Sequence, residues 1–196
     1  MNEIKTLIAF EGHDGVGKTT LINLLKLELQ KKGYAAKYFY SLPDKFNDMR
    51  KHIDSFNDLE LSFWFYAIGD LMAVSNALGD DCEILLFDRY IYSTLVSHIA
   101  RGLKVNDEKV LSFFPIPDMT FYINVDRNEL CRRVFLRNDT ESNDLEIVQN
   151  SKLLDVAEDL YGKYSMIYID NNGNIAEAYS EILLHIEEYL LRNRSG

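Results

Sequence analysis

The chain has 196 residues, of which 47% are hydrophobic and 27% charged, a composition typical of a globular protein with one sizeable core. Its formal net charge of −10 argues against a nucleic-acid polymer as partner, because no basic surface is available to meet phosphates. Two distant cysteines, no signal-peptide pattern and no apolar run long enough for a bilayer favour a cytoplasmic protein without a membrane partner.

The first predicted elements are a strand over residues 7–10, a glycine-rich loop and a helix over residues 20–29. Between strand and helix, residues 12–19 fit the phosphate-binding pattern GxxxxGK[ST] at every fixed position. In this pattern backbone N–H groups bind phosphate oxygens, the lysine (here Lys18) reaches the outer phosphates, and the hydroxyl (here Thr19) ligates Mg²⁺. The alternative is an accidental glycine turn, but the strand and helix context favours a nucleoside triphosphate site. Its expected residues are Gly12, His13, Asp14, Gly15, Val16, Gly17, Lys18, Thr19 and Thr20.

Three elements follow before the middle of the chain. Residues 34–40 are rich in aromatics and predict a strand that ends at a proline turn, and residues 45–56 predict a helix only weakly. Residues 59–78 predict a long helix with Asp58 as a possible cap. This helix is apolar on most sides, so we expect it to be buried between other elements or in a subunit interface.

The second half continues the alternation of strands and helices. Strands are predicted over residues 83–88, 119–125 and 166–170, and helices over 92–101, 105–114, 127–136, 145–164 and 175–191. The pattern predicts an α/β chain with the three-layer fold of P-loop NTPases, in which helices cover both faces of a mostly parallel five-stranded sheet. We expect one domain over residues 1–196, with a mobile lid at about residues 133–145.

A metal-binding acid and an arginine follow each other at the end of the third predicted strand. Carboxyl ends of parallel strands meet on the loop side of a sheet, so Asp88 and Thr19 are expected to share a Mg²⁺ shell. Arg89 is placed to hold an acceptor phosphate by two parallel hydrogen bonds. The alternatives are a helix-capping aspartate and a surface arginine.

Three arginines border the predicted lid. An arginine that closes over a transferring phosphoryl group stabilises the charge on its oxygens. Arg133 and Arg137 are one helical turn apart and share a face, which favours this pair over Arg132 for that role. The alternative is a solvated helix face.

Three stretches together resemble the thymidylate kinases: residues 10–20, residues 87–90 with Ser93, and residues 117–122. Their order and spacing and the total length are similar to those of the family. The resemblance implies transfer of the ATP γ-phosphoryl group to a nucleoside monophosphate, dTMP to dTDP, with Mg²⁺ and in a homodimer. It also implies that Asp14 lies near the acceptor sugar and, since Gly15 stands where one subgroup has a catalytic arginine, that the lid supplies arginines instead.

The acceptor side departs from the family pattern. Ser41 and Gly69 stand where the family has arginines, and Ser97 and His98 stand where residues contact thymine. Either the acceptor is not thymidylate, or cations such as Arg50 and Arg101 substitute for the missing pair. The expected catalytic residues are Lys18, Asp14, Asp88, Arg89, Arg133 and Arg137, and the expected substrate-binding residues are Phe65, Arg89, Ser93, Ser97 and His98.

Some roles stay open at this point. His98 fits a base or sugar contact and a helix histidine without a role equally well, and Phe65 fits stacking on a base as well as the core. Two other functions compete with the family function: a kinase that phosphorylates a free hydroxyl, with Asp14 or Asp88 as base, and a non-catalytic nucleotide-binding protein.

Overall fold

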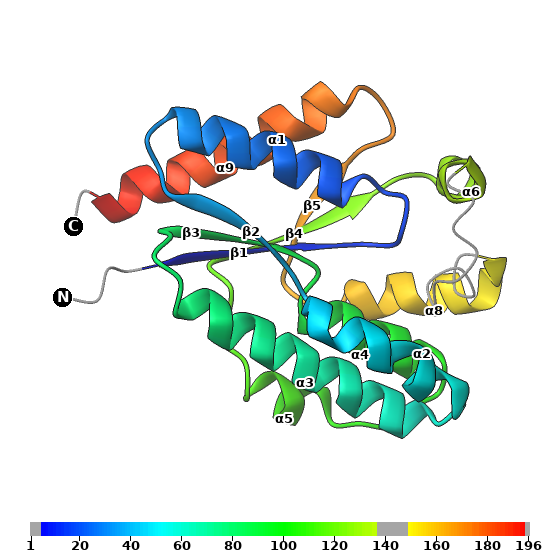
Figure 1. The fold of residues 1–196 in the computed structure, drawn as a ribbon. Helices are drawn as coiled ribbons and strands as arrows, with labels where there is room; N and C mark the ends of the chain where they lie inside the picture. Colours follow the sequence, from blue (N-terminus) through cyan, green and yellow to red (C-terminus); the bar gives the residue numbers. More distant parts are fainter. Residues whose placement is uncertain (1–4, 137–148, 195–196) are drawn as a thin grey trace.

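Five parallel strands form the centre of the structure, a computed structural model that describes residues 5–136 and 149–194 (Figure 1). The strands follow the order β2-β3-β1-β4-β5, and every neighbouring pair is parallel. Their bounds are Thr6–Glu11 for β1, Ala36–Tyr40 for β2, Ile84–Asp88 for β3, Met119–Asn124 for β4 and Ile167–Asp170 for β5. The predicted five-stranded parallel sheet is therefore confirmed.

Helices cover both faces of this sheet (Figure 1). On one face lie α1 (Lys18–Lys31) and α9 (Ile175–Arg194), and on the other lie α3 (Leu59–Leu78), α4 (Ile91–Ala100) and α8 (Ser151–Tyr161). The other described elements are a 3₁₀ turn at Asp44–Phe46 and the helices α2 (Asn47–Ser55), α5 (Asp107–Leu111) and α6 (Arg127–Leu136).

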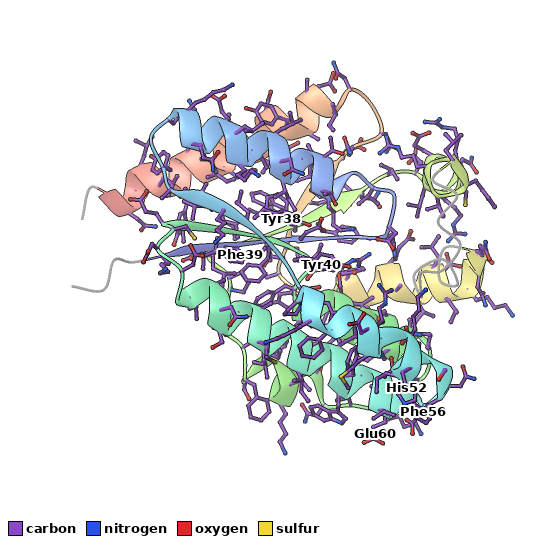
Figure 2. All side chains as sticks on the ribbon, in the orientation of Figure 1. Tyr38, Phe39, Tyr40, His52, Phe56 and Glu60 are labelled. Atoms are coloured by element: carbon purple, nitrogen blue, oxygen red, sulfur yellow. The ribbon has the colours of Figure 1, made fainter. Side chains whose placement is uncertain are left out.

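The alternation of side chains along each strand divides the core between the two faces. In β1, Ile8 and Phe10 pack into the cluster that contains the leucines of α1, whereas Leu7 and Ala9 pack into the cluster that contains Phe63 of α3. Along β2 the aromatic side chains alternate in the same way (Figure 2), so Phe39 stacks on a phenylalanine of β3 while its neighbours Tyr38 and Tyr40 face the other side. Because helices cover both faces, the inner strands β1 and β3 are buried along their whole length, which fits their nearly continuous apolar sequence.

Helix α3 has the bounds predicted from the sequence, because the Asp58 carboxylate accepts hydrogen bonds from the N–H groups of Glu60 and Leu61 at its start. Contrary to the sequence expectation, α3 is long and apolar enough to cross a membrane by length and composition, alone among the helices of the described residues. Half of its most apolar window is buried in the protein, as in a core helix packed on a sheet.

Other predicted bounds were wrong at capping residues. The predicted helix 105–114 shrinks to α5, because the Asn106 side chain accepts from the N–H of Lys109 and fixes the start, and Pro115 follows the last turn. The predicted helix 145–164 is interrupted at Asn150, which adopts an extended conformation and caps the start of α8. The lid beyond residue 136, with Arg137, lies outside the described residues up to residue 148.

Candidate active site

The glycine loop between β1 and α1 follows a path that excludes side chains. Gly12 has φ +128°, and a Cβ atom there would lie 2.3 Å from the Ile123 carbonyl oxygen of β4. Gly17 has φ +99° in the left-handed region and immediately precedes α1. The loop can therefore wrap closely around an anion at the helix N-terminus, which is the arrangement that the phosphate-binding pattern predicts.

Lys18 is buried at the first position of α1 and spans the loop. Its Nζ atom donates to the carbonyl oxygens of Gly12 and His13, both at 2.9 Å. His13 lies beneath the loop, where burial, Lys18 and Arg89 lower its pKa to about 3, so its imidazole is neutral. The imidazole packs edge-on against the Tyr161 ring, and its Nε2 atom is buried without a hydrogen-bond partner among the described residues.

A hydroxyl and a carboxylate meet beside this lysine. The Thr19 Oγ1 atom donates to Oδ2 of Asp88 at 2.5 Å, and the Tyr38 hydroxyl donates to the same oxygen at 3.2 Å. Asp88 stands at the carboxyl end of β3 and is buried. Hard oxygen donors of this kind suit Mg²⁺, so the pair fits the predicted metal site in its chemistry and in its position next to the phosphate loop.

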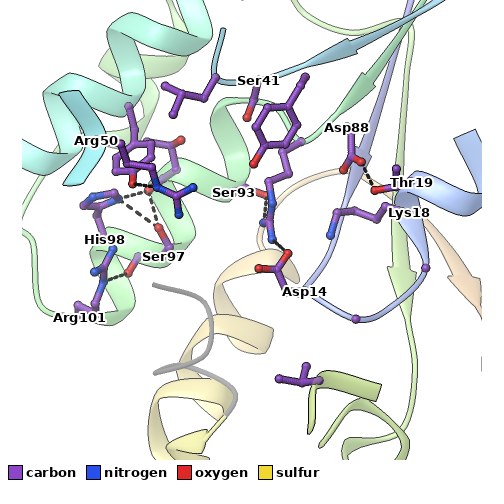
Figure 3. A pocket seen from close by; sticks show the side chains of 18 residues that line it. Asp14, Lys18, Thr19, Ser41, Arg50, Asp88, Ser93, Ser97, His98 and Arg101 are labelled. Atoms are coloured by element: carbon purple, nitrogen blue, oxygen red, sulfur yellow. Dashed lines mark hydrogen bonds and ion pairs between the residues drawn. The ribbon is translucent and has the colours of Figure 1, made fainter. Parts of the chain in front are cut away.

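Arg89 follows Asp88 in an unusual backbone conformation, with φ +70°. Its Nη2 atom donates to Oδ1 of Asp14 at 2.5 Å, and its Nη1 atom donates to the Ser93 hydroxyl at 3.1 Å (Figure 3). The structure thus brings together the loop, through Asp14, and the predicted acceptor residues Arg89 and Ser93.

A cavity of about 280 Å³ opens from this point between the glycine loop and helices α3 and α4 (Figure 3). Of the predicted site residues, Asp14, Gly15, Gly17, Lys18, Thr19, Asp88, Arg89, Ser93, Ser97 and His98 line it. Phe65 does not: it is buried against Phe46, and its neighbour Tyr66 lines the cavity instead. The interpretation of Phe65 as a core residue is the one that its position favours.

His98 lines the cavity but has internal partners for both ring nitrogens. Nδ1 lies 2.8 Å from the Thr94 carbonyl oxygen, which can only accept, so Nδ1 carries the proton. Nε2 then accepts from the Ser62 hydroxyl at 3.1 Å. Burial lowers the His98 pKa to about 4. A neutral, oriented imidazole of this kind forms part of the cavity wall; its contact with a substrate stays a prediction.

Two cations that the sequence only suggested reach the same cavity. Arg50 of α2 donates through Nε to the Tyr66 hydroxyl at 3.0 Å, and Arg101, just after α4, donates through Nε to the Ser97 carbonyl oxygen at 2.9 Å. Gly69, by contrast, faces Leu42, because a Cβ atom at Gly69 would lie 2.5 Å from Leu42 Cδ1. Leucine therefore fills the space that a side chain at position 69 would need.

Arg133 lies at a second cavity, of about 290 Å³, together with Thr20. Its guanidinium donates to Glu129 at 2.6 Å, to the Asn171 carbonyl oxygen at 2.9 Å and to the Val16 carbonyl oxygen at 3.4 Å. Asn171 also donates to Val16, at 2.7 Å. Arg133 thus supports the glycine loop, and its predicted role at the transferred phosphoryl group stays a prediction, as does that of Arg137, which lies outside the described residues.

Sequence reasoning missed two buried carboxyl groups that lie behind residues of this site. Glu11, at the end of β1, is fully buried, and desolvation raises its pKa to about 7. Asp70 of α3 accepts from the Thr94 hydroxyl at 2.8 Å, and burial raises its pKa well above the ordinary value. An acid in an otherwise apolar strand or helix was the signal that could have found both.

Comparisons with known proteins agree with this geometry. The family model described as thymidylate kinase matches residues 10–182. A "probable thymidylate kinase" of Sulfurisphaera tokodaii is 32% identical over 178 residues, which cover 87% of this chain and 90% of that protein. "Probable thymidylate kinase 1" of Saccharolobus solfataricus is 28% identical over 192 residues, covering 95% and 100%.

Among solved structures, the thymidylate kinase of Candida albicans is similar in fold, with a TM-score of 0.71, 19% identity and coverage of 94% of this chain and 92% of that one. The match of the family model over most of the chain, with the glycine loop and the Asp88–Arg89 pair within it, shows that the chain belongs to the thymidylate kinase family.

Proposed function

We propose that this protein transfers the γ-phosphoryl group of ATP to the phosphate of dTMP, giving ADP and dTDP. The observation that supports this most directly is the juxtaposition of Lys18, Thr19 and Asp88 with Arg89 at one end of the 280 Å³ cavity. An oxygen of the acceptor phosphate attacks the γ-phosphorus, the bond to the β–γ bridging oxygen breaks, and ADP leaves with that electron pair.

The position of each residue in the cavity indicates which substrate group it binds. The backbone N–H groups of the glycine loop and Lys18 hold the triphosphate, with Lys18 exchanging its two carbonyl acceptors for phosphate oxygens. Thr19 and Asp88 would hold Mg²⁺, which neutralises charge on the phosphate oxygens when it is bound. Arg89 binds the acceptor phosphate, and Asp14 orients its guanidinium.

Arg50 and Arg101 support dTMP as the acceptor in spite of the missing arginines at Ser41 and Gly69. Both line the cavity wall on the side away from the glycine loop (Figure 3), so the cavity has positive charge near both ends. This arrangement favours the interpretation in which the two arginines take over acceptor contacts, because an acceptor nucleotide is an anion.

The proposed function is tested by measuring ADP release from Mg·ATP with dTMP, dUMP, other nucleoside monophosphates and the matching free nucleosides. We expect turnover with dTMP and none with thymidine. Turnover with a free nucleoside, and with no monophosphate, would overturn the proposal in favour of a hydroxyl acceptor. Lys18→Ala is expected to remove turnover, with Lys31→Ala at the exposed end of α1 as control.

We also propose that the protein is a homodimer that pairs through α3. Its exposed face carries an apolar stripe at heptad-like spacing, made of Leu61, Trp64, Ile68, Leu71 and Leu78. Light scattering tests this: Ile68→Glu should give a monomer, and Leu27→Glu on the exposed face of α1 should not. The cytoplasmic location and the absence of nucleic-acid and membrane partners stay predictions.

A further inference from the structure

Hydrogen bonds from two successive backbone N–H groups hold Arg89 in its strained backbone conformation. A non-glycine residue with φ near +70° costs about 1 kcal/mol, so such a conformation persists only where the surroundings hold it. Its own N–H donates to the Phe10 carbonyl oxygen of β1 at 2.9 Å, and the next N–H, that of Tyr90, donates to Glu11 Oε1 at 3.0 Å. The strained turn is therefore tied to the end of β1 on two successive residues.

The guanidinium is held through the Ser93 hydroxyl. Ser93 Oγ has one hydrogen, which it donates to Glu11 Oε2. Ser93 Oγ can therefore only accept hydrogen bonds from its two other neighbours, Arg89 Nη1 at 3.1 Å and the Tyr161 hydroxyl at 3.1 Å, with one lone pair for each. Glu11 thus decides which way this hydroxyl points, and it leaves Ser93 as an acceptor for the arginine.

Glu11 itself is completely buried and does not line the cavity. One of its carboxylate oxygens accepts from the N–H of Tyr90, which follows Arg89, and the other accepts from the hydroxyl of Ser93, to which Arg89 donates. We propose that Glu11 is a positioning residue, which acts through Tyr90 and Ser93 to aim the Arg89 guanidinium at the acceptor phosphate. This inference rests on the proposed function, because it assigns Arg89 to the acceptor.

Glu11→Gln is the variant that separates this role from packing. Glutamine has the same shape, and its oxygen can still accept from the Tyr90 N–H. Its amide nitrogen, however, donates to Ser93 Oγ, so the Ser93 hydrogen turns away from position 11 and the hydroxyl loses the orientation that makes it an acceptor for both Arg89 and Tyr161. The matched control is Glu83→Gln, which alters a carboxylate that also accepts a backbone N–H, that of Ala35, near the start of β3.

The kinetic test is a double-mutant cycle with Arg89→Ala. At pH 8, where the Glu11 carboxyl is ionised, we expect Glu11→Gln to lower kcat/KM for dTMP about tenfold while KM for ATP stays within about twofold of wild type. In the Arg89→Ala background the same change should cost less than about twofold, because the group that Glu11 positions is gone. An equal loss in both backgrounds, or an equal rise in both KM values, would overturn the proposal.

A second measurement needs no substrate. In the ligand-free protein, the Arg89 side-chain Nε–H resonance, assigned by its loss in Arg89→Lys, should shift or broaden in Glu11→Gln. The corresponding Arg101 resonance should not change, since Arg101 donates to the Ser97 carbonyl instead. An unchanged Arg89 resonance overturns the inference even if dTMP is no substrate, whereas a changed resonance without dTMP turnover overturns only the proposed function.

Discussion

Removing the charge of Glu11 should stabilise the protein increasingly as the pH rises. Burial raises the Glu11 pKa from its ordinary 4.5 to about 7, although Ser93, Arg89 and Lys18 oppose the shift. The unfolded chain therefore releases this proton near pH 4.5 and the folded chain only near pH 7. Between these values the folded state holds a proton that the unfolded state has lost, so raising the pH favours unfolding.

The magnitude follows from the two pKa values. At 1.36 kcal/mol per pKa unit, the difference between 4.5 and about 7 corresponds to about 3 kcal/mol of folding free energy, lost between those pH values. Glutamine carries no titrating proton. The free energy of unfolding of Glu11→Gln, relative to wild type, should therefore rise by up to about 3 kcal/mol from pH 4.5 to pH 8.

Equilibrium unfolding in urea at a series of pH values measures this difference, with Glu181→Gln on the exposed surface of α9 as control. Groups distant from Glu11 titrate equally in wild type and variant, so their contributions cancel in the difference, whereas Asp70, whose pKa the Glu11 charge helps to raise, adds to the change in the same direction. A difference that does not change with pH would refute the reasoning. Together with the expected fall in kcat/KM for dTMP, a more stable but less active variant would separate the role of Glu11 in the site from a role in the fold.

Three further outcomes are expected. Arg89→Ala should raise KM for dTMP or lower kcat with little effect on KM for ATP, measured by steady-state kinetics. Gly69→Ala should raise KM for dTMP, because the new Cβ displaces Leu42 from the cavity wall; KM for ATP is the internal control, and an unchanged KM for dTMP would contradict the wall assignment. Asn150→Ala should lower stability by about 1 kcal/mol, or Tm by roughly 2–4 °C, through loss of the α8 cap.

The positions of the residues on the donor side of the candidate site follow from local patterns, while their roles stay predictions. The strand, loop and helix of residues 6–31 follow from a short stretch of chain, and the Gly12 and Gly17 conformations are the ones that the pattern requires. Asp88 lies within hydrogen-bond distance of Thr19, as expected, because parallel strands bring their carboxyl ends to one edge of the sheet. These inferences needed only topology.

The acceptor half depended on tertiary packing that no local pattern reveals. Phe65 was expected at the substrate, but the rotation of α3 turns it toward Phe46 and brings Tyr66 to the cavity. Arg50 reaches the cavity only because the chain between β2 and α3 folds over it. Glu11 was hidden in an apolar strand, and its function depends on Tyr90 and Ser93, which lie about 80 residues away in the sequence.

The strand order also has a consequence for the synthesis of the chain. The glycine loop leaves the ribosome before the strands that hold it in place, because β1 pairs only with β3 and β4 among the described strands, and Thr6 is made 78 residues before its partner Ile84. At about 5–20 residues per second this delay is about 4–16 seconds. Gly12 also packs on the Ile123 carbonyl, so the loop reaches its binding shape only after β4 has emerged. Until then the backbone N–H and C=O groups of β1 have no neighbouring strand, and we expect chaperones to bind this exposed strand.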